Sequence, residues 1–362
     1  MIPFVIPLHT PALGVETVRT YHAAVGESCA TLLQRVAGAL ADKDETPLML
    51  MVFGRNEATR DAHRLLAGIP HGREWPVLLV EGRPCHEGPM AGVQVFALPA
   101  AREIRRIHCD GLAVGSVFED GDARHCLLAG MGPRTIQGAA PTAQTIETFS
   151  RLESALGQAG FRIADIARTW FYNRDILAWY DEFNRVRNAF YRKKAFRTGS
   201  TPASTGIEGR NPAGAALALA AWAVQPLTEQ GVVREVASPL QCPAPAYGSA
   251  FSRAMEISSG GRTRLLVSGT ASIAPGGDSI WPGDPARQIA QTMDVIAAIL
   301  RSRGLGFADV TRASAYFKRV QDLPHFERWL GSHGFGSMPY LPMHCDVCRD
   351  DLLFELELDA CR

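Results

Sequence analysis

The sequence predicts a fold of the α+β or α/β type, built from two related units that follow one another along the chain. Three observations lead to this prediction. Residues 144–172 match residues 288–316 without a gap, so the chain contains an internal repeat. Strand-like and helix-like segments alternate within each copy of the repeat. The length of 362 residues suits two domains, or one large one.

Each copy begins with a strand that ends in glycine, at 126–130 and at 265–269. Apolar side chains at helical spacing follow, and they predict an amphipathic helix in each copy. These side chains are Ile146, Phe149, Leu152 and Leu156 in the first copy, and Ile289, Met293, Ile296 and Leu300 in the second. Asp284 before Pro285 predicts the start of the second helix, and Gly160 and Gly304 stand where helices end.

The rest of each copy adds a β-rich run, at 166–172 and 310–317, and a second helix, at 177–194 and 323–330. A closing strand is predicted at 352–358. The N-terminal part supplies strand candidates at 48–53, 77–80 and 93–98 and helix candidates at 29–40 and 58–66. A proline-rich stretch at 241–247 marks the region that links the units. We therefore expect an N-terminal domain at 1–225, with extra strands and helices, and a C-terminal domain at 226–362.

The composition excludes several classes of protein. Lys and Arg number 37 and Asp and Glu number 37, so the formal charge is zero, and this argues against a nucleic-acid or membrane-surface partner. No apolar run has the ~18–20 residues that span a bilayer. The N-terminus lacks the basic region of a signal peptide, so we expect a cytoplasmic protein. The eight cysteines are expected to be thiols, and Cys345 and Cys348 beside His344 are too few ligands for a structural zinc ion.

Four segments of the second copy resemble the RidA/YjgF module: LVSGTASI at 266–273, QT at 291–292, GLGFADV at 304–310 and CRDDLLFELEL at 348–358. Two such modules in one chain, with WFYNRDILAWYDEFNRVR at 170–187 and STGIEG at 204–209, resemble the chorismatase family. The resemblance covers roughly residues 120–360. It implies an α+β fold of tandem RidA/YjgF-like modules with the chorismate-mutase-like topology, in which mixed β-sheets are backed by helices.

The resemblance also implies an activity. Chorismatases release pyruvate from the enolpyruvyl ether of chorismate, a small-molecule substrate, without a metal or an organic cofactor. The family's acid is a glutamate on the last strand, which matches Glu355. A cysteine seven residues earlier, as Cys348 is here, belongs to the branch that forms 3-hydroxybenzoate; relatives also give 4-hydroxybenzoate. The segment from Gly269 through Thr270 to Ala271 corresponds to the region where a Gly or Ala choice separates the branches.

The chemistry requires a carboxyl group that burial keeps protonated. Glu355, Glu357 and Asp359 share one face of the predicted closing strand, and taken alone such an acidic face reads as surface. The family match changes this expectation for Glu355, whereas Glu357 and Asp359 are expected to face water.

A doubly anionic substrate also needs guanidinium groups and polar donors. The arginine candidates are Arg187, Arg253, Arg328 and Arg349, with the best claim for Arg349, although on a regular strand it and Cys348 would point to opposite faces. Glycine-containing turns after strands, at 204–206 with Thr205 and Gly206 and at 268–270, are expected to offer backbone donors. Tyr172 and its repeat equivalent Tyr316 either close the pocket or pack in the core, and we expect the core for at least one.

Other functions remain open at this stage. They are hydrolysis of chorismate to pyruvate and a dihydroxycyclohexadiene carboxylate, enamine or imine deamination as in single RidA modules, and metabolite binding without catalysis. RidA modules assemble in threes. The chain is therefore either a monomer, in which the N-terminal third completes an internal pseudo-trimer, or a homotrimer.

Overall fold

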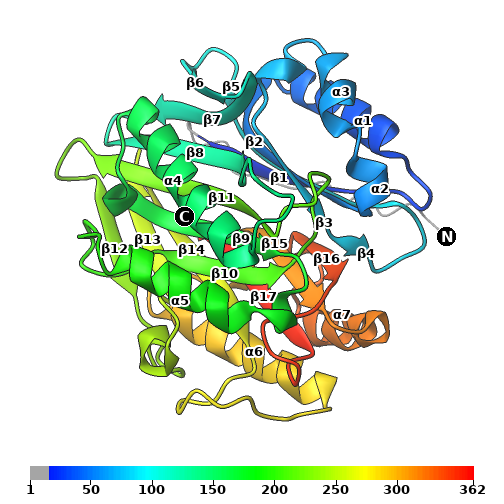
Figure 1. Cartoon of the computed structure of the whole chain (residues 1–362). Coiled ribbons are helices and arrows are strands. Elements are labelled where there is room, and N and C mark those ends of the chain that lie inside the picture. The colour runs from blue at the N-terminus through cyan, green and yellow to red at the C-terminus, as the bar shows by residue number, and fades with distance from the viewer. Residues whose placement is uncertain (1–15) are drawn as a thin grey trace.

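The computed structural model describes residues 16–362, and within this range the strands form three β-sheets with helices on their outer faces (Figure 1). The first sheet comes from the N-terminal third and has the strand order β1-β5-β2-β3. Its strands are β1 (Thr17–His22), β2 (Glu45–Gly54), β3 (Val77–Glu81) and β5 (Met90–Pro99). Its helices are α1 (Cys29–Ala41), α2 (Asn56–Thr59) and α3 (Ala62–Ala67).

The second sheet has the order β10-β9-β11-β8-β7-β6. Its strands are β6 (Arg105–Cys109), β7 (Leu112–Glu119), β8 (Ala123–Met131), β9 (Ile166–Asn173), β10 (Ala203–Glu208) and β11 (Leu217–Pro226). Helices α4 (Pro141–Ala159) and α5 (Tyr180–Tyr191) pack side by side on its outer face (Figure 1).

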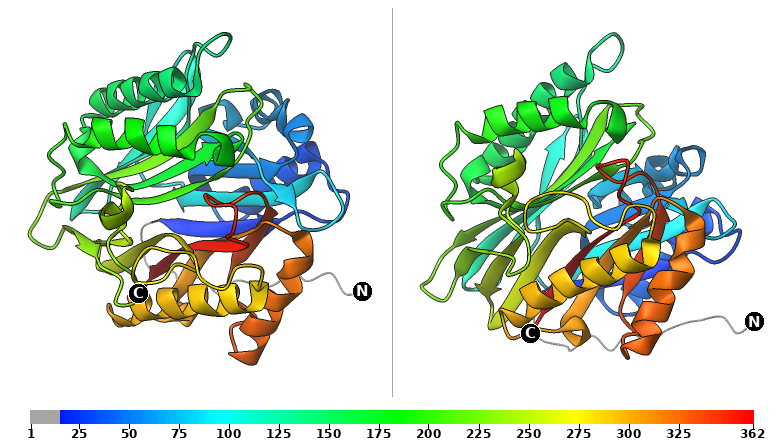
Figure 2. Two further views of the ribbon diagram at one scale, coloured as in Figure 1. Left: turned by 60° about the horizontal axis from the view of Figure 1, so that its bottom comes forward. Right: turned by 90° about the horizontal axis from the view of Figure 1, so that it is seen from below.

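The third sheet has the order β12-β13-β14-β17-β15-β16-β4. Its strands are β12 (Val232–Val236), β13 (Ala254–Ser259), β14 (Arg262–Ala271), β15 (Val310–Phe317), β16 (Tyr340–His344) and β17 (Phe354–Cys361), with β4 (Arg83–Pro84) added from the N-terminal part. Helices α6 (Pro285–Arg301) and α7 (Leu323–Ser332) cover it on the outside (Figure 2).

The three sheets repeat one topology. In each, an antiparallel pair (β1 with β5, β8 with β11, β14 with β17) continues into a second antiparallel pair and then into a parallel pair (β2 with β3, β9 with β10, β15 with β16). The parallel pair lies at the edge of the first two sheets, and β4 extends the third sheet beyond it. The N-terminal third is therefore a third unit of the same design, which the sequence repeat did not reveal. The chain thus contains a pseudo-threefold arrangement.

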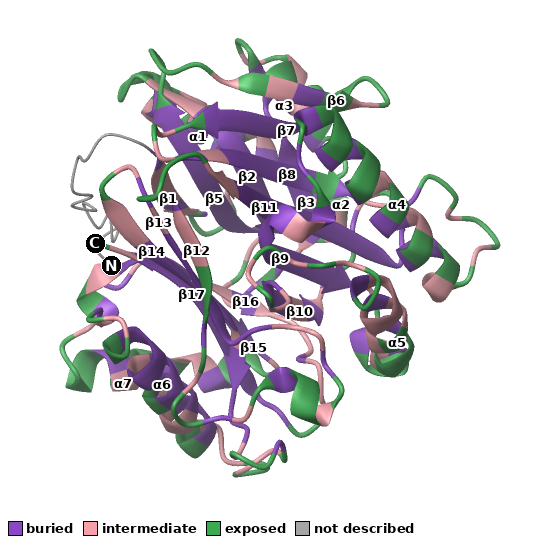
Figure 3. Cartoon of the chain, turned by 90° about the vertical axis from the view of Figure 1, so that its left-hand side faces the viewer, coloured by how far each residue is buried: buried purple, intermediate pink, exposed green. Residues whose placement is uncertain are grey.

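The buried core has a central part and three outer parts. The central cluster joins the inner faces of all three sheets, with Phe53, Trp170, Tyr172, Trp222 and Tyr316 among its members. Each outer cluster lies between one sheet and its own helices. The strands are consequently buried on both faces, as Figure 3 shows, while the helices expose their outer sides. Burial of both faces explains why strands such as β2 and β11 read as continuous apolar runs rather than alternating ones.

The predicted α+β fold of tandem units, with mixed sheets backed by helices, is confirmed. The helix boundaries follow the predicted signals: the side chain of Asp284 accepts a hydrogen bond from the backbone N–H of Arg287, and Gly160 ends α4 with φ +78°. The division into domains at 225 and 226 stays a prediction; the chain passes between the second and third sheets at this point. Within residues 16–362, none of the helices is both long and apolar enough to cross a membrane.

Several local predictions are wrong. Ile146 is 60% exposed, because α4 turns the polar residues Thr145 and Thr148 inward instead. The single helix predicted at 58–66 is broken into α2 and α3. The segments 204–206 and 268–270 are not turns but parts of β10 and β14, and their glycines make room for the side chains of Tyr180 (at Gly206) and Glu355 (at Gly269) rather than reversing the chain.

Candidate active site

A cavity that is partly open to solvent lies where the edge of the second sheet meets the third. We call it the interface cavity. Its walls come from β10, β14, β17, α5 and the loop that connects β16 to β17. The residues that line it are Tyr180, Arg187, Ser204, Gly206, Tyr247, Ser249, Phe251, Arg253, Gly269, Ala271, Ile273, Cys348, Arg349 and Glu355.

Hydrogen bonds between β10 and β14 hold the two sheets together below the cavity. The backbone N–H of Ser204 donates to the hydroxyl of Ser268 at 2.8 Å, and the backbone N–H of Gly269 donates to the hydroxyl of Thr205 at 3.1 Å. The β14–β17 register shifts between Val267 and Thr270. A bulge of this kind re-aims the residues around it, and here it brings Gly269 against the side chain of Glu355.

Glu355 provides the buried acid of the cavity. It lies at the start of β17, paired with Ala271 of β14 and Tyr316 of β15, and only 4% of its surface is exposed. Burial raises the pKa of this carboxyl to about 8, and the negative charge of Glu357 adds to the shift. The carboxyl is therefore mostly protonated at pH 7, as a general acid must be.

Gly269 makes room for that carboxyl. A Cβ atom at this position would overlap Oε1 of Glu355 and would also come within 3.3 Å of Cγ2 of Thr205. Gly269→Ala is therefore expected to displace the carboxyl of Glu355, because the end of a side chain moves more easily than the strand. We expect kcat for the reaction proposed below to fall by about tenfold or more, since misplacing a reacting group is costly. The thermal midpoint should change by only a few degrees. Unchanged kcat in the folded variant would contradict this placement of Glu355.

Three guanidinium groups line the cavity without a carboxylate partner. Arg187, Arg253 and Arg349 form no ion pair with Asp or Glu of residues 16–362, and Arg187 and Arg253 are almost fully buried. Arg253 donates to the carbonyl oxygen of Cys242 at 2.9 and 3.1 Å, and Arg349 donates to that of Gly277 at 2.8 Å. Buried cations need a counter-charge. The cavity is therefore built to accept an anion.

Arg187 keeps the most hydrogen-bonding capacity free. Its Nη2 donates to Oδ1 of Asn184 at 2.6 Å, while its Nε is buried without a partner in the described structure. Aromatic rings hold the guanidinium groups in place: Arg187 and Arg253 lie over Phe251, and Arg253 and Arg349 lie over Tyr247, at 5.4 to 6.0 Å from the ring centres. Burial raises the pKa of Tyr247, so its hydroxyl stays neutral and can donate a hydrogen bond.

Cys348 and Arg349 both lie in the loop between β16 and β17, and both line the cavity. The conflict expected for neighbours on a regular strand therefore does not arise. Burial raises the pKa of Cys348 to about 12, and the negative charge of Glu355 adds to the shift. Its sulfur is thus present as a thiol, which can donate a weak hydrogen bond but is a poor nucleophile.

Four of the predicted binding residues lie elsewhere. Arg328 is exposed on α7 and is not among the residues that line the cavity, and Tyr172 is buried in the central core, where its hydroxyl lies 3.4 Å from that of Tyr316. Thr270 and Thr205 are not among the residues that line the cavity, and their hydroxyl groups bind other protein groups. The hydroxyl of Thr270 donates to the carbonyl oxygen of Ser268, and that of Thr205 donates to Glu357. The predicted Arg187, Arg253, Arg349, Gly206, Gly269 and Ala271 do line the cavity with Glu355 and Cys348.

The expected exposure of Glu357 and Asp359 is wrong. Glu357 is 0% and Asp359 4% exposed, because the acidic face of β17 packs against the second sheet rather than facing water. The sequence analysis also missed Tyr180, Tyr247 and Phe251. Tyr180 lies in the aromatic-rich stretch 170–187, and the aromatic content of this stretch could have pointed to it. Nothing in the sequence connects Tyr247 or Phe251 to the site. Within residues 16–362, no group of His, Cys, Asp and Glu side chains could hold a metal ion.

Comparisons with known proteins bear on this arrangement. No protein-family model matches the chain. A protein of Streptomyces rapamycinicus named chorismatase is 26% identical over 245 residues, which cover 62% of this chain and 72% of the relative. The chain is thus similar in sequence to chorismatases. A second relative, the 3-hydroxybenzoate synthase of Streptomyces hygroscopicus, is 25% identical over 264 residues, which cover 65% of this chain and 74% of the relative.

The chorismatase fold extends over almost the whole chain. A solved chorismatase superposes with a TM-score of 0.64 at 19% identity and covers 96% of this chain and 100% of its own. The N-terminal sheet is thus part of the chorismatase fold. This likeness concerns the fold alone.

Proposed function

We propose that this chain is an enzyme that cleaves the enolpyruvyl ether of chorismate and releases pyruvate and 3-hydroxybenzoate. One observation carries the proposal: a buried carboxyl that is mostly neutral at pH 7 shares a cavity with three arginines that lack protein carboxylate partners. Chorismate carries two carboxylates and an acid-labile enol ether, so it matches both features. The names of the relatives, chorismatase and 3-hydroxybenzoate synthase, support the same substrate.

The arrangement suggests how the residues act. Arg187, Arg253 and Arg349 hold the two carboxylates, because planar guanidinium forks bind such groups in two-point fashion. Glu355 gives its proton to the methylene carbon of the enolpyruvyl group, which becomes the methyl group of pyruvate. The ether bond to the ring then breaks as the oxygen of the neighbouring ring hydroxyl bonds to the same carbon, which releases pyruvate and leaves an epoxide, while the hydroxyl proton returns to Glu355. Protonation of the epoxide oxygen opens its bond to the carbon that first carried the hydroxyl. Loss of the ring proton from the carbon that keeps the oxygen gives 3-hydroxybenzoate and restores the proton to the enzyme.

Cys348 supports the aromatic product. Pyruvate and 3-hydroxybenzoate together contain all the atoms of chorismate, so this route consumes no water and needs no cofactor, whereas hydrolysis to a dihydroxycyclohexadiene carboxylate adds one water. Cys348 stands seven residues before Glu355, as in the branch that forms 3-hydroxybenzoate. Its neutral S–H faces the same cavity and is available to assist ring opening of an intermediate.

Incubation of the purified chain with chorismate tests the proposal. We expect equal amounts of pyruvate, measured by coupled reduction with lactate dehydrogenase, and 3-hydroxybenzoate, identified by chromatography. A folded protein that releases no pyruvate would rule out the activity. Pyruvate with a dihydroxycyclohexadiene carboxylate would leave the substrate in place and overturn the branch. Ammonia from 2-aminoacrylate without pyruvate from chorismate would favour deamination.

We also propose that the chain works as a monomer in the cytoplasm. The three sheets supply within one chain the threefold arrangement that single modules reach by assembly, which supports a particle of 39.2 kDa. All eight cysteines are unpaired, which supports a reducing compartment. Light scattering after size exclusion should give the mass of one chain, and a mass three times larger would contradict the internal trimer.

A further inference from the structure

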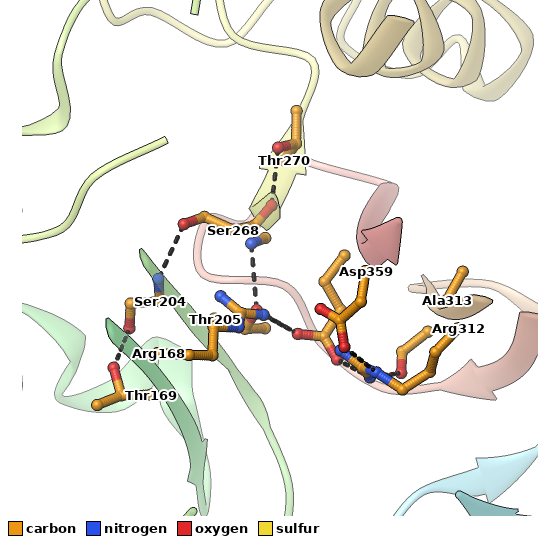
Figure 4. Close-up of polar contacts among 12 residues, drawn as sticks. Arg168, Thr169, Ser204, Thr205, Ser268, Thr270, Arg312, Ala313 and Asp359 are labelled. Carbon is orange, nitrogen blue, oxygen red and sulfur yellow. Dashed lines mark hydrogen bonds and ion pairs between the residues drawn. The ribbon is translucent and has the colours of Figure 1, made fainter. Parts of the chain in front are cut away.

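A second carboxylate lies behind Glu355 in the core. Glu357 is two residues further along β17, on the same face, and it is completely buried. Its Oε1 accepts a hydrogen bond from Nη1 of Arg312 at 2.9 Å, and its Oε2 accepts from Arg168 and, at 2.5 Å, from the hydroxyl of Thr205. Arg312 also binds Asp359 through Nε at 2.8 Å. We call Arg168, Arg312, Glu357 and Asp359 the charge cluster. Figure 4 shows Arg168 approaching from one side, next to Thr205, and Arg312 from the other, next to Asp359.

The two arginines are equivalent in the internal repeat, but the acids are not. Arg168 and Arg312 occupy the same position of β9 and β15, one from each sheet. Glu357 of β17 pairs with Ser314 of β15. Trp170 of β9 is the repeat equivalent of Ser314, and it pairs with Ala220 of β11, so Ala220 is the equivalent of Glu357. The register likewise relates Glu355 to Ala218. The buried carboxylate of Glu357 therefore occurs in the same unit as Glu355 and has no equivalent in the second sheet. A carboxylate that served only to neutralise Arg168 could equally have been placed in the second sheet.

The cluster holds Glu357 in its ionised form. Burial alone would raise the pKa of this carboxyl, but the charges of Arg312 and Arg168 outweigh burial and hold the pKa to about 2. A fixed negative charge is thus present at neutral pH. Residues two apart on one face of a strand are neighbours. The negative charge of Glu357 therefore disfavours a second negative charge on Glu355, and this helps Glu355 to retain its proton.

Thr205 connects the cluster to the floor of the interface cavity. Its hydroxyl donates to Glu357 and accepts hydrogen bonds from Arg168 at 2.6 Å and from the backbone N–H of Gly269 at 3.1 Å. Gly269 is the residue that lies against the carboxyl of Glu355. The contacts that hold Glu357 therefore also fix β14, the strand against which the side chain of Glu355 lies.

We propose that Glu357 is a positioning residue for the proposed reaction: its carboxylate, fixed by two buried guanidinium groups, keeps the carboxyl of Glu355 in its neutral, proton-bearing form. This inference rests on the proposed role of Glu355 as the acid. Other groups also influence Glu355. The titratable and charged groups that face Glu355 or its cavity come from several elements. They are Glu357 of β17, Arg168 of β9, Tyr316 of β15, Tyr247 and Arg253 of the segment before β13, Tyr180 and Arg187 of α5, and Cys348 and Arg349 of the β16–β17 loop.

Titration of Glu355 itself tests the inference without requiring turnover. Difference infrared spectroscopy follows the carbonyl band of the protonated carboxyl, with the Glu355→Gln spectrum subtracted. Glu357→Gln should lower the titration midpoint of Glu355 by about one pH unit or more, because it removes the anion and leaves Arg168 unopposed. Arg168→Gln should raise the midpoint, because Arg312 and Thr205 still hold Glu357. Loss of structure alone does not produce shifts of opposite sign.

The matched control is Asp359→Asn, which removes an equally buried carboxylate two residues further from Glu355. It should move the midpoint less than half as far as Glu357→Gln. A midpoint that is the same in the folded Glu357→Gln variant as in the unmodified protein would overturn the inference. Should Glu357→Gln not fold alone, the double variant Arg168→Gln/Glu357→Gln is compared with Arg168→Gln: a lower midpoint in the double variant supports the inference and an equal midpoint refutes it. Failure of the proposed function gives a different result, because the unmodified protein would then release no pyruvate whatever the midpoints are.

Discussion

Replacing Glu355 with glutamine is expected to reduce kcat for pyruvate release from chorismate by about a thousandfold or more, within the range that a general acid contributes. Glutamine keeps the size of the side chain but has no proton to give at neutral pH. The affinity for chorismate should change by only a few-fold, since the three arginines remain. Single-turnover measurement of pyruvate, with separate measurement of chorismate binding, distinguishes loss of chemistry from loss of binding. A variant with more than a tenth of the original kcat would exclude Glu355 as the acid.

The same variant carries its own control for folding. The pKa of Glu355 is about 8 in the folded chain against an ordinary 4.5, so the folded state holds the proton more tightly. The stability that this proton contributes is complete below pH 4.5 and is lost as the pH rises through 8. Glutamine does not titrate. Glu355→Gln should therefore gain stability over the unmodified protein as the pH rises, by about 3 kcal/mol at pH 7, and inactivity cannot then be attributed to unfolding.

Replacing Arg187 with methionine is expected to raise KM for chorismate by about a hundredfold, the loss of a charge-assisted contact to a carboxylate. Methionine keeps most of the apolar stem that packs against Phe183 and Phe251, so the fold should persist. The effect on kcat should be smaller, because Arg187 binds the substrate and does not transfer the proton. Steady-state kinetics with chorismate separate the two parameters.

Arg328→Met provides the matched control. Arg328 is exposed on α7, outside the interface cavity, so its replacement removes the same charge without touching the site. KM and kcat should both stay within about twofold of the unmodified protein. Equal increases of KM in the two variants would mean that the overall charge of the protein attracts chorismate, and that the cavity arginines do not grip it.

The sequence predicted the parts of the fold that leave local signals. The repeat around Gln144 and Gln288 and the helix signals at Asp284 and Gly160 all correspond to elements of the structure. The third unit remained one of two alternatives, because its sequence shares no residue pattern with the repeat. Its membership depends on strand order, which arises from pairing between distant segments.

The candidate site was predictable only where single residues carry the chemistry. Glu355, Cys348 and Arg349 follow from the family resemblance, and the cavity contains all three. The burial of Glu357 was not predictable, because alternating acids along one strand look the same whether they face water or two arginines of neighbouring strands. The repeat did pair Arg168 with Arg312, yet two arginines at one position gave no indication that their side chains would meet on a single carboxylate.

The pH dependence of kcat/KM for pyruvate release tests the central claim, that a shielded Glu355 supplies the proton, most directly. The account predicts a rate that is level near neutral pH and falls about tenfold for each pH unit above a midpoint near 8. A midpoint near 4.5, the ordinary value for an exposed glutamate, or a rate that rises between pH 7 and 9, would contradict it.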